Sequence, residues 1–135
     1  MAEVSQTPGS VLPGADADYI RGIAGGTITA GMPIYKDATT NQLLNADANG
    51  SAETAEVIGI ALNAASLGQP LRVQTAGVIS IGGTVVLATI YILGAAGGIA
   101  PAADLASGWY TSVIGVAISA TQLRLGIFPS RALKA

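Results

Sequence analysis

The chain has 135 residues, with six basic and eight acidic side chains, a net charge of −2 at pH 7, no Cys and no His. Without Cys there is no disulfide or thiolate chemistry, and without His there is no imidazole ligand, Ser–His pair or Cys–His pair. The six basic residues are scattered, so the sequence predicts neither a nucleic-acid partner nor attachment to an anionic membrane.

Small side chains dominate the apolar half of the composition. The chain contains 25 Ala and 18 Gly residues but only one Trp, four Tyr and one Phe. Such side chains bury little apolar area, at roughly 25 cal/mol per Å². We therefore expect a thin core in one copy and a homo-oligomer in which copies cover one another.

Residues 1–22 predict an extended N-terminal arm, because prolines and glycines between positions 8 and 14 interrupt any periodicity. Two interpretations stay open: a flexible terminus, or an arm that becomes ordered only on a partner. The second predicts that a chain lacking residues 2–18 folds but no longer binds. The start is not a secretory signal, so we expect the protein to remain in the cytoplasm that makes it, or in a particle assembled there. The arm residues nominated for contact with a partner are Val4, Val11, Leu12, Pro13 and Tyr19.

Residues 23–129 predict a β domain, and residues 130–135 a C-terminal tail. "EVIGIALN" and "SVIGVAIS" are apolar on both faces, as in strands buried on both sides. "LRVQT" and "GVISIGG" read as two separate strands, and "QLRLGIF" alternates with Leu123, Leu125 and Ile127 inward. About ten short strands predict an all-β fold, a small antiparallel barrel or sandwich.

The domain contains an internal repeat. "VIGIALNAA" returns as "VIGVAISAT" 56 residues later, Ile34-Tyr35 returns as Ile90-Tyr91 at the same spacing, and "LRV" returns as "LRL" after 52 residues. This order predicts two related halves, residues 26–80 and 82–129. Gly59 and Gly115 occupy the same place in the repeated strand, where a glycine marks a bulge or a close backbone approach.

The repeat also explains a long uncharged segment. No Asp, Glu, Lys or Arg occurs between Arg72 and Asp104, and "GTVVLATIYILGAAGGIA" lies within this gap. Its dense apolar part is about half the 20 residues that a spanning helix needs, and glycines bracket it. Because Ile90-Tyr91 repeats a pair from a hydrophilic segment, we expect strands here and no membrane partner.

No catalytic residue, metal site, cofactor or small-molecule substrate is predicted. Asp47, Asn49 and Glu53 faintly resemble a calcium loop, but their spacing departs from the motif and a solvated loop is the better interpretation. Trp109 and Tyr110 are either interface anchors or part of the core at a strand edge. Arg72 and Arg124 complete the set of nominated interface anchors.

Several segments together resemble the capsid cement (head decoration) proteins of tailed phages. They are "AGMPIYKD", "ADAN", "VIGIALNAASLGQPLRVQTAGVI" and "GGIAPAADLASGWYTSVIGVAISATQLRLGI", and the likeness covers about residues 20–129. Its most specific part is the run from Gly59 to Val73. The arm and the tail "PSRALKA" match no family pattern.

The resemblance implies a β-rich virion protein, often trimeric, on the outer capsid surface. Its partner would be the major capsid protein, whose neighbouring subunits it clamps, and its arm would order against the shell by adding to a sheet edge. One alternative is a tail- or fibre-associated β-module that contacts the host surface through Trp109 or the Asp47 loop. A small lysis-type membrane protein and an enzyme are the weaker alternatives.

Overall fold

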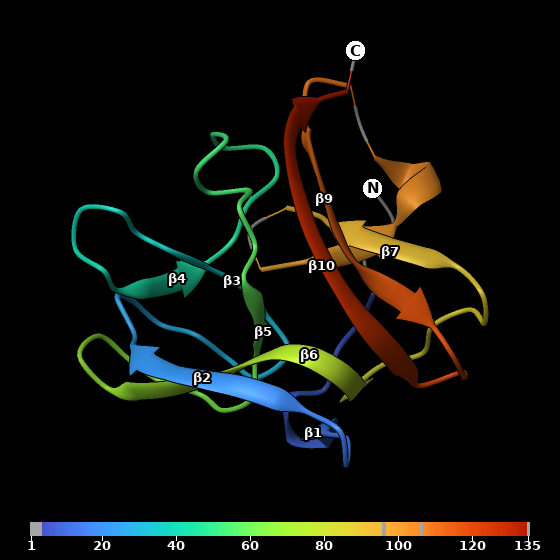
Figure 1. Ribbon diagram of the computed structural model, residues 1–135, viewed down its shortest axis with the longest axis horizontal. Coiled ribbons are helices and arrows are strands. Elements are labelled where there is room, and N and C mark those ends of the chain that lie inside the picture. Colours follow the sequence, from blue (N-terminus) through green and yellow to red (C-terminus); the bar gives the residue numbers. More distant parts are fainter. Residues whose placement is uncertain (1–3, 96, 106, 135) are drawn as a thin grey trace.

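The fold is built almost entirely from short strands. The computed structural model describes residues 4–95, 97–105 and 107–134, and this part holds no α-helix. It contains ten strands and two 3₁₀ turns, of which the second begins after Pro101 (Figure 1). In chain order these elements are η1 (Pro8–Ser10), β1 (Val11–Pro13), β2 (Asp18–Ile23), β3 (Pro33–Lys36), β4 (Leu43–Asn45), β5 (Gly59–Ala61), β6 (Pro70–Ile81), β7 (Ile90–Leu93), β8 (Ile99–Pro101), η2 (Ala102–Asp104), β9 (Tyr110–Ala117) and β10 (Gln122–Leu133).

One antiparallel sheet joins the ten strands and curls into an open half-barrel (Figure 1). Its main path is β4-β3-β5-β6-β10-β9-β7-β8, and β1 and β2 pair with β6 off this path. In this order, strands β3 to β6 make up one half of the sheet and strands β7 to β10 make up the other half. The repeated residues occupy matching strands: Ile34 and Ile90 lie in β3 and β7, and Gly59 and Gly115 in β5 and β9. The residues that the repeat pairs therefore lie in strands at corresponding places of the sheet order.

β6 is the strand that connects the two halves. Its residues 70–76 pair with β2 and β5, and its residues 77–81 pair with β1 and β10. The change of partners falls at Gly77, whose φ of +91° is a backbone conformation that favours glycine. The sequence interpretation divided this segment into two strands. The structure shows one bent strand of 12 residues.

The N-terminal arm completes the first half of the sheet. Arg21 of β2 lies opposite Arg72, and Val78 of β6 lies opposite Arg124. Arg72 and Arg124 are equivalent in the repeat. β2 therefore pairs with the strand that carries Arg72 in the same way as the end of β6 pairs with the strand that carries Arg124. The described arm is thus paired within its own chain, contrary to an arm that orders only on a partner. Its removal would leave an edge of β6 unpaired.

Two clusters of buried side chains form the core. The larger gathers residues from both halves and from the arm, including Val11, Ile60, Ile79 and Ile114. The smaller lies in the first half, around Ile34, Leu43, Leu71 and Val73. The alternation predicted for "QLRLGIF" is confirmed, because Leu123 and Leu125 are buried and Ile127 packs against the larger cluster.

The long uncharged segment forms β7 and β8, which pair with each other as antiparallel strands. Tyr91, Ile92, Leu93 and Ile99 are buried, so the segment supplies part of the core. In the described residues we find no helix with the length and apolar character required to cross a membrane. The prediction of strands in this segment is confirmed at β7 and β8, whereas residues 84–89 before β7 belong to no strand.

Candidate functional site

The arm residues nominated for partner contact divide into two groups. The backbone N–H of Val4 donates to the carbonyl oxygen of Ile99 at 2.7 Å, and Val11 is buried in the larger core cluster. These two residues are engaged within the chain. Leu12, Pro13 and Tyr19 are exposed and Val4 is half-buried, so the first three are the most accessible to a partner.

Gln6 fixes the arm to the domain, which the sequence did not reveal. Its side-chain amide donates hydrogen bonds to the carbonyl oxygens of Gly31 at 2.8 Å and Ile81 at 3.1 Å. The two acceptors lie 25 and 75 residues away along the chain. No local pattern could identify a glutamine whose role depends on such distant carbonyl groups.

An open groove of about 670 Å³ lies between the arm and the region where β6 ends. Hydroxyl side chains predominate in its lining, and none of the described lining residues is ionisable. The groove therefore offers neutral hydrogen-bonding groups but no acid or base. The hydroxyl residues are Ser5, Thr7, Ser10, Ser80, Thr84 and Thr121.

The nominated interface anchors lie in different parts of the sheet. Trp109 and Tyr110 are half-buried and pack against the larger core cluster at the start of β9. Arg124 lies in β10 and has Asp16 at 3.6 Å, with both side chains largely exposed. Arg72 lies in the first half, where its guanidinium group stacks over Tyr19. The sequence identified these residues but could not show that they are dispersed.

Among the described residues, two titratable groups have shifted pKa values. A hydrogen bond from the N–H of Val78, with a smaller effect of Arg124, lowers the pKa of Asp16 below its ordinary value of 3.8. Burial, with smaller effects of the carboxylates of Asp37 and Glu53, raises the pKa of Tyr35 above 10.0. Both groups lie outside the groove described above.

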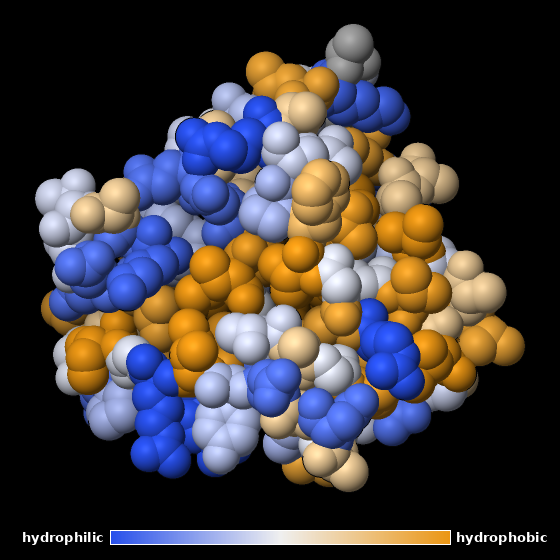
Figure 2. Space-filling model, in the orientation of Figure 1, coloured by the Kyte–Doolittle hydropathy of each residue, from blue (hydrophilic) through white to orange (hydrophobic). Residues whose placement is uncertain are grey.

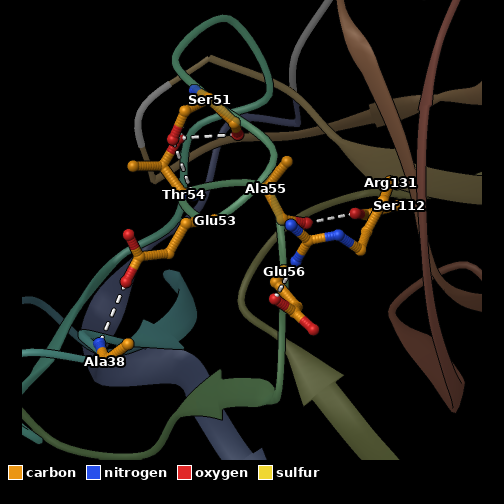
Figure 3. Close-up of polar contacts among 8 residues, drawn as sticks. All are labelled: Ala38, Ser51, Glu53, Thr54, Ala55, Glu56, Ser112 and Arg131. Atoms are coloured by element: carbon orange, nitrogen blue, oxygen red, sulfur yellow. Dashed lines mark hydrogen bonds and ion pairs between the residues drawn. The ribbon is translucent and has the colours of Figure 1, made fainter.

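The polar groups of the acidic loop between β4 and β5 bind one another or neighbouring segments of the chain (Figure 3). The carboxylate of Asp47 accepts the N–H of Asn49 at 2.9 Å, and the carboxylate of Glu53 accepts the N–H of Ala38 at 2.9 Å. Beyond these contacts, Ser51 and Thr54 bond to each other, Ser112 donates to Ala55, and Arg131 pairs with Glu56 at 2.6 Å. Among the described residues, no three His, Cys, Asp or Glu side chains converge on a possible metal site.

Gly59 and Gly115 sit where a neighbouring strand approaches closely. A Cβ at Gly59 would overlap the carbonyl oxygen of Gln74, and one at Gly115 would overlap the carbonyl oxygen of Arg124. Both obstacles are backbone atoms of the strand that follows in the same half, so neither can move aside as a flexible side chain would. The repeat thus preserves a packing requirement at this pair of positions.

An apolar patch is exposed in the second half, around the end of β9 and the chain before β7. The sequence predicted that "SVIGVAIS" is buried on both faces, but Val116 and Ile118 are each 40% exposed. Val116 lies opposite Ile90, which is also exposed, and the chain before β7 hydrogen-bonds to the end of β9. We call the exposed residues gathered here the β7–β9 patch: Val86, Leu87, Ile90, Val116 and Ile118.

Figure 2 shows hydrophobic side chains around the end of β9 and the segment that leads to β7, at the lower right of the molecule. Val86 and Leu87 are the most exposed members of the β7–β9 patch, at 65% and 64%. A contiguous group of large apolar side chains in water marks an interaction surface more often than isolated ones do. The patch is therefore the strongest candidate for a contact between protein chains.

The chain was compared with protein-family models and with curated protein sequences. No family model matches it, and no curated protein shows significant similarity to it.

Proposed function

We propose that the protein is a structural component of a tailed-phage virion. It binds the outer surface of the capsid and stabilises the shell by clamping neighbouring subunits of the major capsid protein. The sequence resemblance over residues 20–129 and the all-β fold support this proposal. The protein is made in the host cytoplasm and acts as a homo-oligomer of three copies.

The observation that carries the proposal is the β7–β9 patch. Homo-oligomer interfaces are richer in apolar surface than transient ones, and the patch is apolar throughout. We assign it to the contact between copies. A trimer presents three identical shell-binding surfaces on one rigid body, so contacts that are weak singly bind together with high effective concentration.

Leu87→Asp tests the patch, because it places a charge on a residue that is 64% exposed and should leave the fold intact. Leu67→Asp is the matched control, since Leu67 is 69% exposed but lies outside the patch. We expect the wild-type protein and L67D to sediment as trimers and L87D as a monomer. A trimeric L87D would remove the patch from the subunit contact.

Cosedimentation with empty, expanded capsids of the cognate phage tests the function itself. The wild-type protein should pellet with the capsids and raise the temperature at which they disrupt. L87D should pellet less, because a monomer loses the multivalent contribution. Wild-type protein that stays in the supernatant at saturating capsid concentration would refute the proposal.

The alternative, a tail- or fibre-associated module, depends on Trp109 and the Asp47 loop as host contacts. Trp109 packs against the core, and the Asp47 carboxylate is bound to its own loop. Neither observation favours a host-binding role. Adsorption of the purified protein to host cells, with no binding to capsids, would nevertheless select this alternative.

A further inference from the structure

Two arginines face each other directly across the first half of the sheet. Arg21 of β2 and Arg72 of β6 are cross-strand partners, and their side chains therefore project from the same face. Like charges in this arrangement destabilise a sheet. Strongly hydrophilic side chains stand over β2 at the lower left of Figure 2.

The described residues supply no carboxylate to either member of this pair. The other two arginines are each paired, Arg124 with Asp16 and Arg131 with Glu56. Within the described part of the chain, no ion pair involves Arg21 or Arg72, and the Nε atom of Arg72 is buried without a hydrogen-bond partner. A buried donor of a charged group without an acceptor is costly.

The surroundings hold Arg72 in place. Its guanidinium carbon lies 4.5 Å from the centre of the Tyr19 ring, within the range of a cation–π contact. The side-chain oxygen of Asn63 accepts the backbone N–H of Arg72 at 2.8 Å. A pocket of about 280 Å³ opens beside the pair, lined by Arg21, Asn63, Pro70, Leu71 and Arg72.

We propose that Arg21, Arg72 and Tyr19 form a binding site for a carboxylate supplied by a partner protein. Guanidinium groups bind carboxylates through two parallel hydrogen bonds, and a ring stacked on Arg72 orients it for this contact. The carboxylate lies between the two facing charges and reduces their repulsion. Identifying its source as an Asp or Glu side chain of the major capsid protein rests on the proposed function.

A carboxylate fits the site better than the phosphates of a nucleic acid. Nucleic-acid surfaces collect many basic groups, whereas this chain has six and a net charge of −2. Two of its four arginines are already paired with carboxylates of the chain itself. An isolated pair of arginines beside an aromatic ring suits one acidic side chain.

Arg21→Gln tests the inference on capsids, with Arg131→Gln as the matched control for the loss of one exposed arginine. We expect R21Q to bind capsids about tenfold more weakly, as for the loss of about 1.4 kcal/mol, while its melting temperature stays the same or rises. R131Q should bind as the wild type does. Equal binding by R21Q and the wild type, or weakening only in R131Q, would overturn the inference.

NMR of the isolated protein tests the site without capsids. Sodium acetate should shift the arginine Nε–H resonance of Arg72 and leave that of Arg131 in place, relative to sodium chloride at the same ionic strength. No acetate-specific shift would overturn the site, and a larger response to inorganic phosphate would overturn its preference for carboxylate. An acetate shift in a protein that binds no capsid would retain the site and refute the proposed function.

Discussion

Gly115→Ala should destabilise the protein because of one specific overlap. The new Cβ would meet the carbonyl oxygen of Arg124 and lie 3.1 Å from the Cα of Leu125, both of which belong to the backbone of β10. β9 and β10 would have to separate locally, in the region where Arg124 pairs with Val116. Added atoms in a well-packed site cost about 1–3 kcal/mol.

Gly126→Ala is the matched control for the same chemical change. Gly126 follows Leu125 in β10, but a Cβ at this position would have no heavy atom within 4 Å. Its backbone lies outside the left-handed region, so alanine adopts the same conformation. We expect this variant to be neutral or more stable by about 0.4–1 kcal/mol, because alanine restricts the unfolded chain.

Thermal unfolding followed by circular dichroism distinguishes the two variants. An unfolding entropy of about 2.1 cal/mol/K per residue makes each kcal/mol worth about 3.5 °C in this chain. G115A should therefore melt about 4–10 °C below the wild type, and G126A within about 3 °C of the wild type or above it. Equal melting temperatures of G115A and G126A would refute the close approach of β10 to Gly115.

Two further predictions concern the arm. Val11→Ala should reduce the free energy of unfolding by about 2 kcal/mol, because it removes buried methyl groups. Leu12→Ala, at an exposed neighbour, should change that free energy by less than about 0.5 kcal/mol. Equal effects of the two variants in urea denaturation would show that β1 is not packed. Asp16→Asn should be less stable than the wild type at pH 6, because the lowered pKa of Asp16 contributes stability above pH 3.8 that is lost as pH falls through the folded-state pKa. The difference should shrink below pH 3.8, and a difference that is constant down to pH 2.5 would contradict the pairing of Asp16 with Val78.

From residue type alone, the sequence predicted some of the residues that form the candidate surfaces. It nominated Arg72 as an interface anchor and Tyr19 as a residue of the shell-binding arm, so the two were assigned to different sites. Their contact arises because β2 pairs with β6, and this pairing joins segments about 50 residues apart. Arg21 was not singled out, since a lone arginine in a strand has no signal until its cross-strand partner is known.

The sequence alone determined the all-β class and the strands in the uncharged segment, because side-chain alternation is a local signal. It also predicted two related halves from an internal repeat, a signal that is found by direct comparison within the sequence. The tertiary structure decided that the arm is part of the sheet, that β6 is one bent strand, and that Val116 and Ile118 face solvent. These features depend on which strands lie next to each other in the sheet. Edge pairing uses backbone groups that every residue except proline carries in full, so the identity of the residues does not specify the partner.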